Sequence, residues 1–304
     1  MLGRALEARA KLTMSLGKVV LFTALALANC AFILAGFRAL KRREHIEWPT
    51  WIDVLIGFVT DFFDTLGIGS FAPTTAIFKL RRIPADELIP GTLNVGHNAA
   101  AVIETVIFVS SVAVDPLLLI LMVGSAAVGA WLGAGVVARL PRRAIQLFMG
   151  VALLIAATVF ILSNLGALPA GGVAMGLAGW RMTFAVGANF VFGALMSVGI
   201  GLYAPCMIVL ALLGLHPLAA FPIMMGACGL VQPVASLRFL QSGRFALRSA
   251  LGLTIGGVFG VFIAAFVVKQ LPITALRWLV IVVVIYASIL MLRSARRSKR
   301  VQQP

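Results

Sequence analysis

The sequence predicts an all-α, polytopic membrane protein with two inverted repeats, each a re-entrant broken-helix hairpin followed by three transmembrane helices, and one extra helix before them. Three observations predict this fold. The 304 residues are 61% hydrophobic and only 12% charged, with a mean hydropathy of +1.06, so their solvent must be largely lipid. A seven-residue signature at 67–73 recurs, nearly unchanged, at 199–205. Basic residues gather in short connections between apolar runs, as membrane topology requires.

The chain is expected to begin with an uncleaved anchor helix. Residues 19–37 form a run without a single charge, which is long enough to cross a bilayer. The run is longer than the apolar core of a signal peptide, and no small-residue cleavage site follows it. Residues 1–50 are therefore interpreted as a basic N-terminal tail, an anchor helix and a basic loop.

The rest of the chain divides into two copies of one plan. Repeat 1 covers residues 51–165 and repeat 2 covers residues 166–292, before a basic tail at 293–304. Each copy begins with an apolar segment that two glycines and a proline break, because both residue types interrupt a helix. The broken segments are 51–80 and 180–215, and the expected helical spans are roughly 89–112, 116–140 and 144–165, then 218–240, 250–268 and 273–292. Glycines four residues apart favour close helix packing in each copy: Gly129 and Gly133, then Gly252, Gly256 and Gly260.

The distribution of basic residues decides whether the broken segments cross the membrane. If all nine apolar segments cross, the 25 Lys and Arg residues divide 12 to one face and 13 to the other. If both broken segments are re-entrant, they divide 18 to 7, which the positive-inside rule prefers. A hairpin plus three spans crosses an odd number of times, so repeat 2 is expected to be inverted relative to repeat 1. The richer face includes the C-terminal tail and is predicted to be cytoplasmic, although four of the other seven basic residues lie in the N-terminal tail.

The two breaks predict a ligand site at membrane depth. Irregular backbone is tolerated there only where protein buries it or where it lines a cavity. In each copy a proline, Pro73 or Pro205, falls in the first turn of the second half-helix. The free amides and the positive end of the helix dipole then face the break, and the glycines let a ligand approach the backbone. Two such tips favour an anion site without a buried cation, whereas simple packing kinks are the alternative.

Four ionisable side chains within the apolar segments are candidates for coupling to a proton or a cation. Asp61 and Asp64 are three residues apart and share the helix face that leads to the first break. His97 lies on the next span and can titrate near neutral pH, and Glu104 lies further along that span. The alternative for each is a structural hydrogen bond to open backbone or to a neighbouring helix. Every acidic residue lies at or before Asp115, so repeat 2 contributes none.

Further residues at and near the tips are candidates for substrate binding. Hydroxyls, neutral amides and the exposed backbone at glycine can hydrogen-bond an anion at a modest desolvation cost. Each of them can equally bond a neighbouring turn or helix. The candidates are Gly67, Gly69, Ser70, Pro73, Thr74, Thr75, Asn94, Gly199, Gly201, Tyr203, Pro205, Cys206 and Gln232.

Three motifs are similar to those of a known family of membrane proteins. They are Gly-Ile-Gly-Ser-Phe-Ala-Pro at 67–73, Pro-Gly-Thr-Leu-Asn at 90–94 and Gly-Ile-Gly-Leu-Tyr-Ala-Pro at 199–205. Over roughly residues 51–292 the chain resembles the TauE/SafE family of sulfite and organosulfonate exporters. The resemblance implies secondary transport of a small anion, often a sulfur oxyanion or a carboxylate, across a bacterial inner membrane. The motifs are typical of the family and do not identify the substrate.

Other functional classes lack support in the sequence. It contains no G-x4-G-K-[ST], H-E-x-x-H or G-x-S-x-G motif, and Cys30, Cys206 and Cys228 have no metal-like spacing. Topology accounts for the basic residues without nucleic acid. We therefore expect a secondary transporter rather than an enzyme, with no catalytic residues, metal or cofactor. Its expected partners are a small anionic substrate, the lipid bilayer and a coupling proton or cation. An anion channel or a non-transporting subunit of a membrane complex is the alternative, and an intramembrane enzyme is a third.

Overall fold

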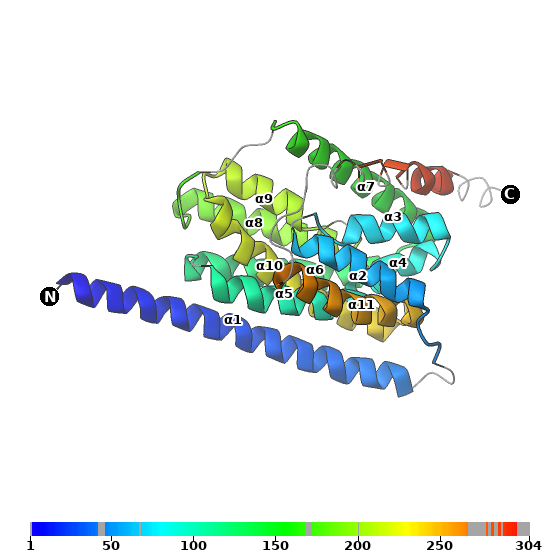
Figure 1. Ribbon diagram of the computed structural model, residues 1–304, viewed down its shortest axis with the longest axis horizontal. Helices are drawn as coiled ribbons and strands as arrows, with labels where there is room; N and C mark the ends of the chain where they lie inside the picture. The colour runs from blue at the N-terminus through cyan, green and yellow to red at the C-terminus, as the bar shows by residue number, and fades with distance from the viewer. Residues whose placement is uncertain are drawn as a thin grey trace.

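The protein is a bundle of α-helices (Figure 1). The computed structural model describes residues 2–41, 46–66, 68–112, 114–167, 172–199, 201–266, 278, 281–282, 285–286 and 288–296. Within these residues there is no β-strand, and six helices are long and apolar enough to cross a membrane. The structure therefore confirms an all-α, polytopic membrane protein.

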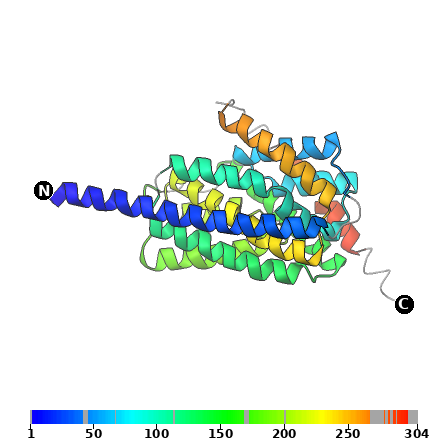
Figure 2. The same cartoon turned by 90° about the horizontal axis from the view of Figure 1, so that it is seen from below.

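The first helix is longer than expected. Helix α1 runs from Leu2 to Lys41, so the residues interpreted as a tail are helical as well. Residues 2–12 consist mainly of Ala, Leu, Arg, Glu and Lys, which are strong helix formers. Helix α1 lies along the face formed by α5, α6 and α10, and its N-terminal part extends beyond the bundle (Figures 1 and 2). Lys18 Nζ donates a hydrogen bond to the backbone oxygen of Ser110, 3.2 Å away, near the point where α1 leaves the bundle.

The first broken segment forms a helical hairpin. Helix α2 (Trp51–Thr65) begins with a capping box between Thr50 and Asp53, and helix α3 (Phe71–Arg81) follows the break. At the break Gly69 has φ +86°, a conformation that side chains with a Cβ adopt at a cost. Arg82, with φ 58°, ends α3 in the left-handed region. We call the residues between α2 and α3 tip 1, here 68–70.

The second broken segment forms a matching hairpin. Helix α8 (Gly179–Met196) and helix α9 (Tyr203–Leu212) flank the break, where Gly199 has φ +98°. We call the residues 197–199 and 201–202 tip 2. Both breaks fall where the repeated signature predicts them, so the expectation of two broken segments is confirmed.

The remaining helices range from the single turn of η1 to spans of more than 20 residues. They are η1 (Asp86–Leu88), α4 (Ile89–Gly96), α5 (Asn98–Ser111), α6 (Pro116–Val137), α7 (Arg142–Asn164), α10 (Pro217–Ser242) and α11 (Leu247–Phe266). The span expected as one simple helix at 89–112 is divided at His97, where side-chain bonds to two other helices fix the residue at the junction. The expected last span at 273–292 lies mostly outside the described residues.

The two hairpins enter the bundle from opposite ends. The start of α2 lies beside the start of α11, because Arg248 Nε donates to Asp53 Oδ2 over 3.0 Å. The residues before α8 lie beside the start of α10, because His216 N donates to Ala174 O over 2.7 Å. Helix α10 spans the bundle between these two places before the chain turns into α11. In Figure 1 the α2–α3 hairpin accordingly occupies one half of the bundle and the α8–α9 hairpin the other.

Glycines bring each hairpin close to a helix of the other repeat. On α11 the glycines lie against the backbone of α2, and a Cβ at any of them would overlap it; these are Gly252, Gly256 and Gly260. On α6 and α8 the same crowding occurs at Gly129, Gly133 and Gly193. Close packing at the predicted small-residue spacing is therefore confirmed. The contacts are reciprocal, since the first helix of each hairpin packs on the second long span of the other copy.

Candidate functional site

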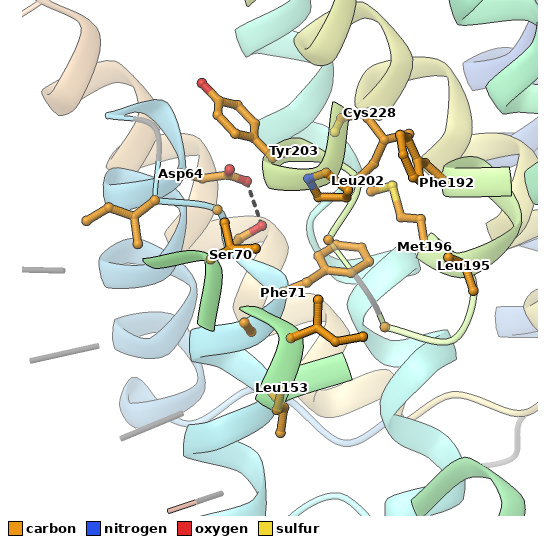
Figure 3. A pocket seen from close by; sticks show the side chains of 18 of the residues that line it. Asp64, Ser70, Phe71, Leu153, Phe192, Leu195, Met196, Leu202, Tyr203 and Cys228 are labelled. Atoms are coloured by element: carbon orange, nitrogen blue, oxygen red, sulfur yellow. Dashed lines mark hydrogen bonds between the residues drawn. The ribbon is translucent and has the colours of Figure 1, made fainter. Parts of the chain in front are cut away.

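A cavity of about 270 Å³ lies where the two tips meet (Figure 3). Tip 1 and the start of α3 form one side of the cavity, and tip 2 and the start of α9 form another. Side chains of α7, α8 and α10 complete the wall. Two segments that are 132 positions apart in the sequence thus share one chamber.

Both half-helices that begin at the cavity lack a side-chain cap. Neither Ser70 at the start of α3 nor Leu202 at the start of α9 caps its helix with a side-chain hydrogen bond. A side chain added at Gly69 or Gly201 would meet nothing within 4 Å, which shows that the backbone at both tips faces open space. The first amides of each helix, with the positive end of its dipole, are therefore available to an anion.

Asp64 is the acidic residue that lines the cavity among those described. Its Oδ2 atom accepts a hydrogen bond of 2.6 Å from the hydroxyl of Ser70, the N-cap residue of α3 (Figure 3). Ser70 does not cap α3, because it has helical dihedral angles, φ −87° and ψ −34°, and not the extended conformation usual for an N-cap residue. The bond to Asp64 joins the last turn of α2 to the first turn of α3 across the break.

Helix α10 contributes a second polar group. Gln232 lines the cavity, is 1% exposed, and has no hydrogen-bond partner for Oε1. A buried amide oxygen without a partner costs free energy unless water or a ligand satisfies it. Cys228 lies one turn earlier on the same helix and also lines the cavity.

A second polar cluster lies behind tip 1, away from the cavity. The Nδ1 atom of His97 lies 2.8 and 2.9 Å from the two carboxylate oxygens of Asp61, and Nε2 lies 3.1 Å from the hydroxyl of Thr74. All three side chains are fully buried. In the neutral tautomer that donates from Nδ1 to Asp61, Nε2 accepts from the Thr74 hydroxyl. The cluster thereby ties α2, α3 and the junction of α4 with α5 together.

Glu104 lies close to both Asp61 and Asp64. Its Oε1 atom accepts a hydrogen bond of 2.7 Å from the hydroxyl of Thr65, which also lies 2.9 Å from the backbone oxygen of Asp61. Glu104 is 1% exposed, and Asp61 and Asp64 are near enough to repel it electrostatically. Three carboxyl groups and one imidazole therefore surround the last turn of α2. The spacing of Asp61 and Asp64 predicts a shared face, and the structure divides the two between the buried cluster and the cavity.

The cavity includes eight of the residues that the sequence singles out: Asp64, Gly69, Ser70, Gly199, Gly201, Tyr203, Pro205 and Gln232. Other candidates lie outside its lining: Pro73 is half-buried, and the rest are buried, namely Asp61, Thr74, Thr75, Asn94, His97, Glu104 and Cys206. Asn94 Nδ2, for example, donates to the backbone oxygen of Pro90 over 2.8 Å. Gly67 lies outside the described residues.

Sequence reasoning missed the apolar part of the cavity. Phe71, Leu153, Phe192 and Met196 line it, whereas the sequence-based candidates contain no Phe, Leu or Met. One signal was present, since Phe71 and Tyr203 occupy the same position of the repeated signature and both face the cavity. The residues from α7 carried no such signal, because only the fold brings that helix to the tips.

Fold and site together define a polytopic membrane protein with two broken hairpins around a central cavity. A comparison with family models gives a match to the sulfite exporter TauE/SafE family over residues 2–161, just over half of the chain. The chain belongs to this family, and is thus a membrane transporter. The match includes α1, which the motif resemblance left out, and ends within α7. No curated protein and no solved structure matches the chain.

Proposed function

We propose that this protein is a secondary transporter of a small anion, a sulfur oxyanion, an organosulfonate or a related carboxylate, and that the cavity between the tips is its binding site. The observation that carries the proposal is the convergence of two uncapped helix N-termini on one chamber. Each end presents free amides and a partial positive charge, so an anion can bind without a lysine or arginine. Family membership supports transport as the activity.

Alternating access supplies the mechanism. Each hairpin packs on a helix of the other repeat, and the hairpins enter from opposite ends of the bundle. This is the arrangement expected of two inverted copies, which can rock about a site at their interface and open it to each side in turn. The reciprocal glycine contacts let whole hairpin-helix units move as bodies, because their backbones are in close contact.

The acidic residues beside tip 1 supply the coupling. Asp64 faces the cavity, and its charge opposes that of an anion bound between the tips. A proton on Asp64 removes this repulsion, so binding of the anion and of the proton favour one another. The buried cluster of Asp61, His97 and Thr74 connects the surrounding helices by hydrogen bonds. Glu104 adds a further carboxyl group beside this cluster.

Counterflow in proteoliposomes tests the proposal. Purified protein is reconstituted with an internal store of unlabelled anion, and entry of labelled sulfite, thiosulfate, sulfoacetate or a small carboxylate is followed with and without an imposed pH gradient. A carrier gives saturable counterflow, and flux that responds to the gradient shows proton coupling. Conductance without counterflow would identify a channel instead. Absence of both would favour a subunit that does not transport alone.

A further inference from the structure

We propose that the cavity selects a monovalent organic anion with an apolar body, such as an alkyl or aryl sulfonate or carboxylate, over the inorganic sulfur oxyanions. The inference rests on the proposed transport function and names the chemical class of the substrate at the same site. Three observations carry it: the size of the cavity, the predominance of apolar side chains in its lining, and the sign of its charge.

The cavity is too large for an inorganic oxyanion alone. Its volume is about 270 Å³. A water molecule takes about 30 Å³ of the liquid, so the cavity has room for about nine non-hydrogen atoms. Sulfite has four such atoms and thiosulfate has five. A ring or a short alkyl chain attached to a sulfonate or carboxylate fills the remaining space.

Apolar side chains make up most of the lining. The polar side chains are those of Asp64, Ser70, Tyr203 and Gln232. Helices α7 and α8 contribute only apolar side chains: Leu153, Ile155, Val159, Phe192, Leu195 and Met196. An anion bound only at the tips would leave these side chains in contact with water. An apolar body would bury them, at a gain of about 25 cal/mol per Å² of apolar surface removed from water.

The charge of the cavity favours one negative charge over two. None of the described residues that line it is Lys, Arg or His, and Asp64 is acidic. The two helix N-termini together offer about one unit of positive charge. With a proton on Asp64, a single sulfonate or carboxylate group matches this charge, whereas the second charge of thiosulfate or of fully ionised sulfite has no partner. The affinity for an organic anion then comes largely from its apolar body.

The test compares transport of charged probes that differ in their apolar part. Proteoliposomes are assayed with labelled benzenesulfonate, methanesulfonate, sulfite and thiosulfate, with protein-free liposomes as the control for leakage. We expect kcat/KM to be at least about tenfold higher for benzenesulfonate than for any of the other three. Equal or faster transport of sulfite or thiosulfate would overturn the inference and leave the proposed transport function standing.

Absence of flux for all four probes would contradict the proposed transport function and would leave the substrate class to be tested by binding. Protection of the detergent-solubilised protein against heat then decides, because binding needs no turnover. A rise in the melting temperature with benzenesulfonate that exceeds the rise with sulfite supports the inference. An equal rise with both, or none with benzenesulfonate, overturns it.

A pair of variants on one helix locates the apolar subsite. Phe192 lines the cavity from α8, whereas Phe190, two residues earlier, is 37% exposed and does not line it. Phe192→Ala should lower the ratio of benzenesulfonate to methanesulfonate transport about tenfold, since it removes an aromatic contact to the ring. Phe190→Ala should keep the wild-type ratio. A Phe192→Ala protein that is folded, as size-exclusion chromatography shows, and that keeps the wild-type ratio would contradict the assignment.

Discussion

Asp64 determines the charge of the cavity. It lies beside the space between two helix N-termini, and its carboxylate accepts a hydrogen bond from the hydroxyl of Ser70. At about 6 Å and an effective dielectric constant of about 20, a negative charge repels a bound anion by about 3 kcal/mol. We therefore expect loss of that charge on protonation to raise the affinity for the anion, so that binding strengthens as the pH falls.

Asp64→Asn should remove this pH dependence. The amide is neutral at every pH, so the affinity for the anion should stay at its acidic value when the pH rises. Counterflow, which requires no net movement of protons, should persist, whereas flux driven by a pH gradient should be lost. Measurements of KM and of gradient-driven uptake between pH 5.5 and 8.5 check this. Ser70→Ala is the matched control because it removes the hydrogen bond and keeps the carboxyl group. Equal pH dependence in Asp64→Asn and wild type would exclude Asp64 as the coupling residue.

Gly257 provides the space that Asp61 occupies. A Cβ at this position would overlap Oδ2 of Asp61, whose carboxylate is already held by His97. Gly257→Ala should therefore destabilise the protein by about 1–3 kcal/mol, the usual cost of overfilling a packed core. The melting temperature in detergent is the measurement. Gly124→Ala on α6 is the control, since a Cβ there meets nothing within 4 Å. Equal melting temperatures for the two variants would show that the side chains around Asp61 can accommodate an added methyl group without loss of stability.

Residues that stand out as ionisable groups in apolar segments were predictable from the sequence. Residues whose role depends on tertiary packing were not. Asp61, Asp64, His97 and Glu104 stand out as ionisable groups in apolar segments, and the structure gathers them around one turn of α2. Gly257 lies outside the four-residue spacing of Gly252, Gly256 and Gly260, and nothing in the sequence gives it a role. Its role depends on the side chain opposite, and only tertiary packing supplies that side chain.

Each hairpin is a unit in which a short tip sets the direction of a helix. In tip 1 the backbone turns at Gly69 with a positive φ, whereas Gly201 in tip 2 has no positive φ. The space beside both glycines is open, so the two positions differ in backbone conformation and not in the space available to a side chain. They form a natural pair for separating backbone strain from steric crowding.

Gly69→Ala should destabilise the protein more than Gly201→Ala. A residue with a Cβ costs about 1–2 kcal/mol in a left-handed conformation, and the strain falls on the turn that positions Ser70. Thermal unfolding in detergent measures the difference. The Gly69→Ala protein should also bind the anion more weakly, as counterflow KM shows. Equal stability of the two variants would indicate that tip 1 can adopt a turn without a positive φ.

At the scale of elements the sequence predicted most of the fold. The repeated signature located both breaks, and the glycine spacing predicted close helix packing, since both depend on local backbone chemistry. The partner of each glycine helix was not predictable, because α11 packs on α2 and α6 on α8 across the two repeats. The division of α4 from α5 at His97 was missed for the same reason: it follows from bonds to α2 and α3.

The whole molecule combines a two-fold architecture with one-sided chemistry. With the 132-residue offset of the signature, Asp61 corresponds to Gly193 and His97 corresponds to Gly229. A Cβ at Gly193 would overlap the backbone oxygen of Ala126, and one at Gly229 would overlap the Thr105 hydroxyl. The second copy thus uses for helix packing the positions that carry the hydrogen-bonded Asp61 and His97 in the first. We therefore expect proton coupling to depend on residues of repeat 1, with repeat 2 contributing shape and helix N-termini to the same cavity.

The placement of the hairpins predicts which ends of the bundle face each side of the membrane. Ala85, after the first hairpin, and Val173, before the second, are both exposed, and the hydrogen bonds of their neighbours place them at opposite ends. The end with Ala85 also carries Arg81, Arg82 and Arg142, so the positive-inside rule assigns it to the cytoplasm.

In a background without Cys30, Cys206 and Cys228, an impermeant maleimide should label Val173→Cys in intact spheroplasts and Ala85→Cys only after permeabilisation. Labelling of both from outside would contradict the inverted arrangement. The reverse pattern would agree with the inverted arrangement but would show that the whole protein has the opposite orientation in the membrane. The introduced thiols serve as each other's control, because they share one background and one reagent.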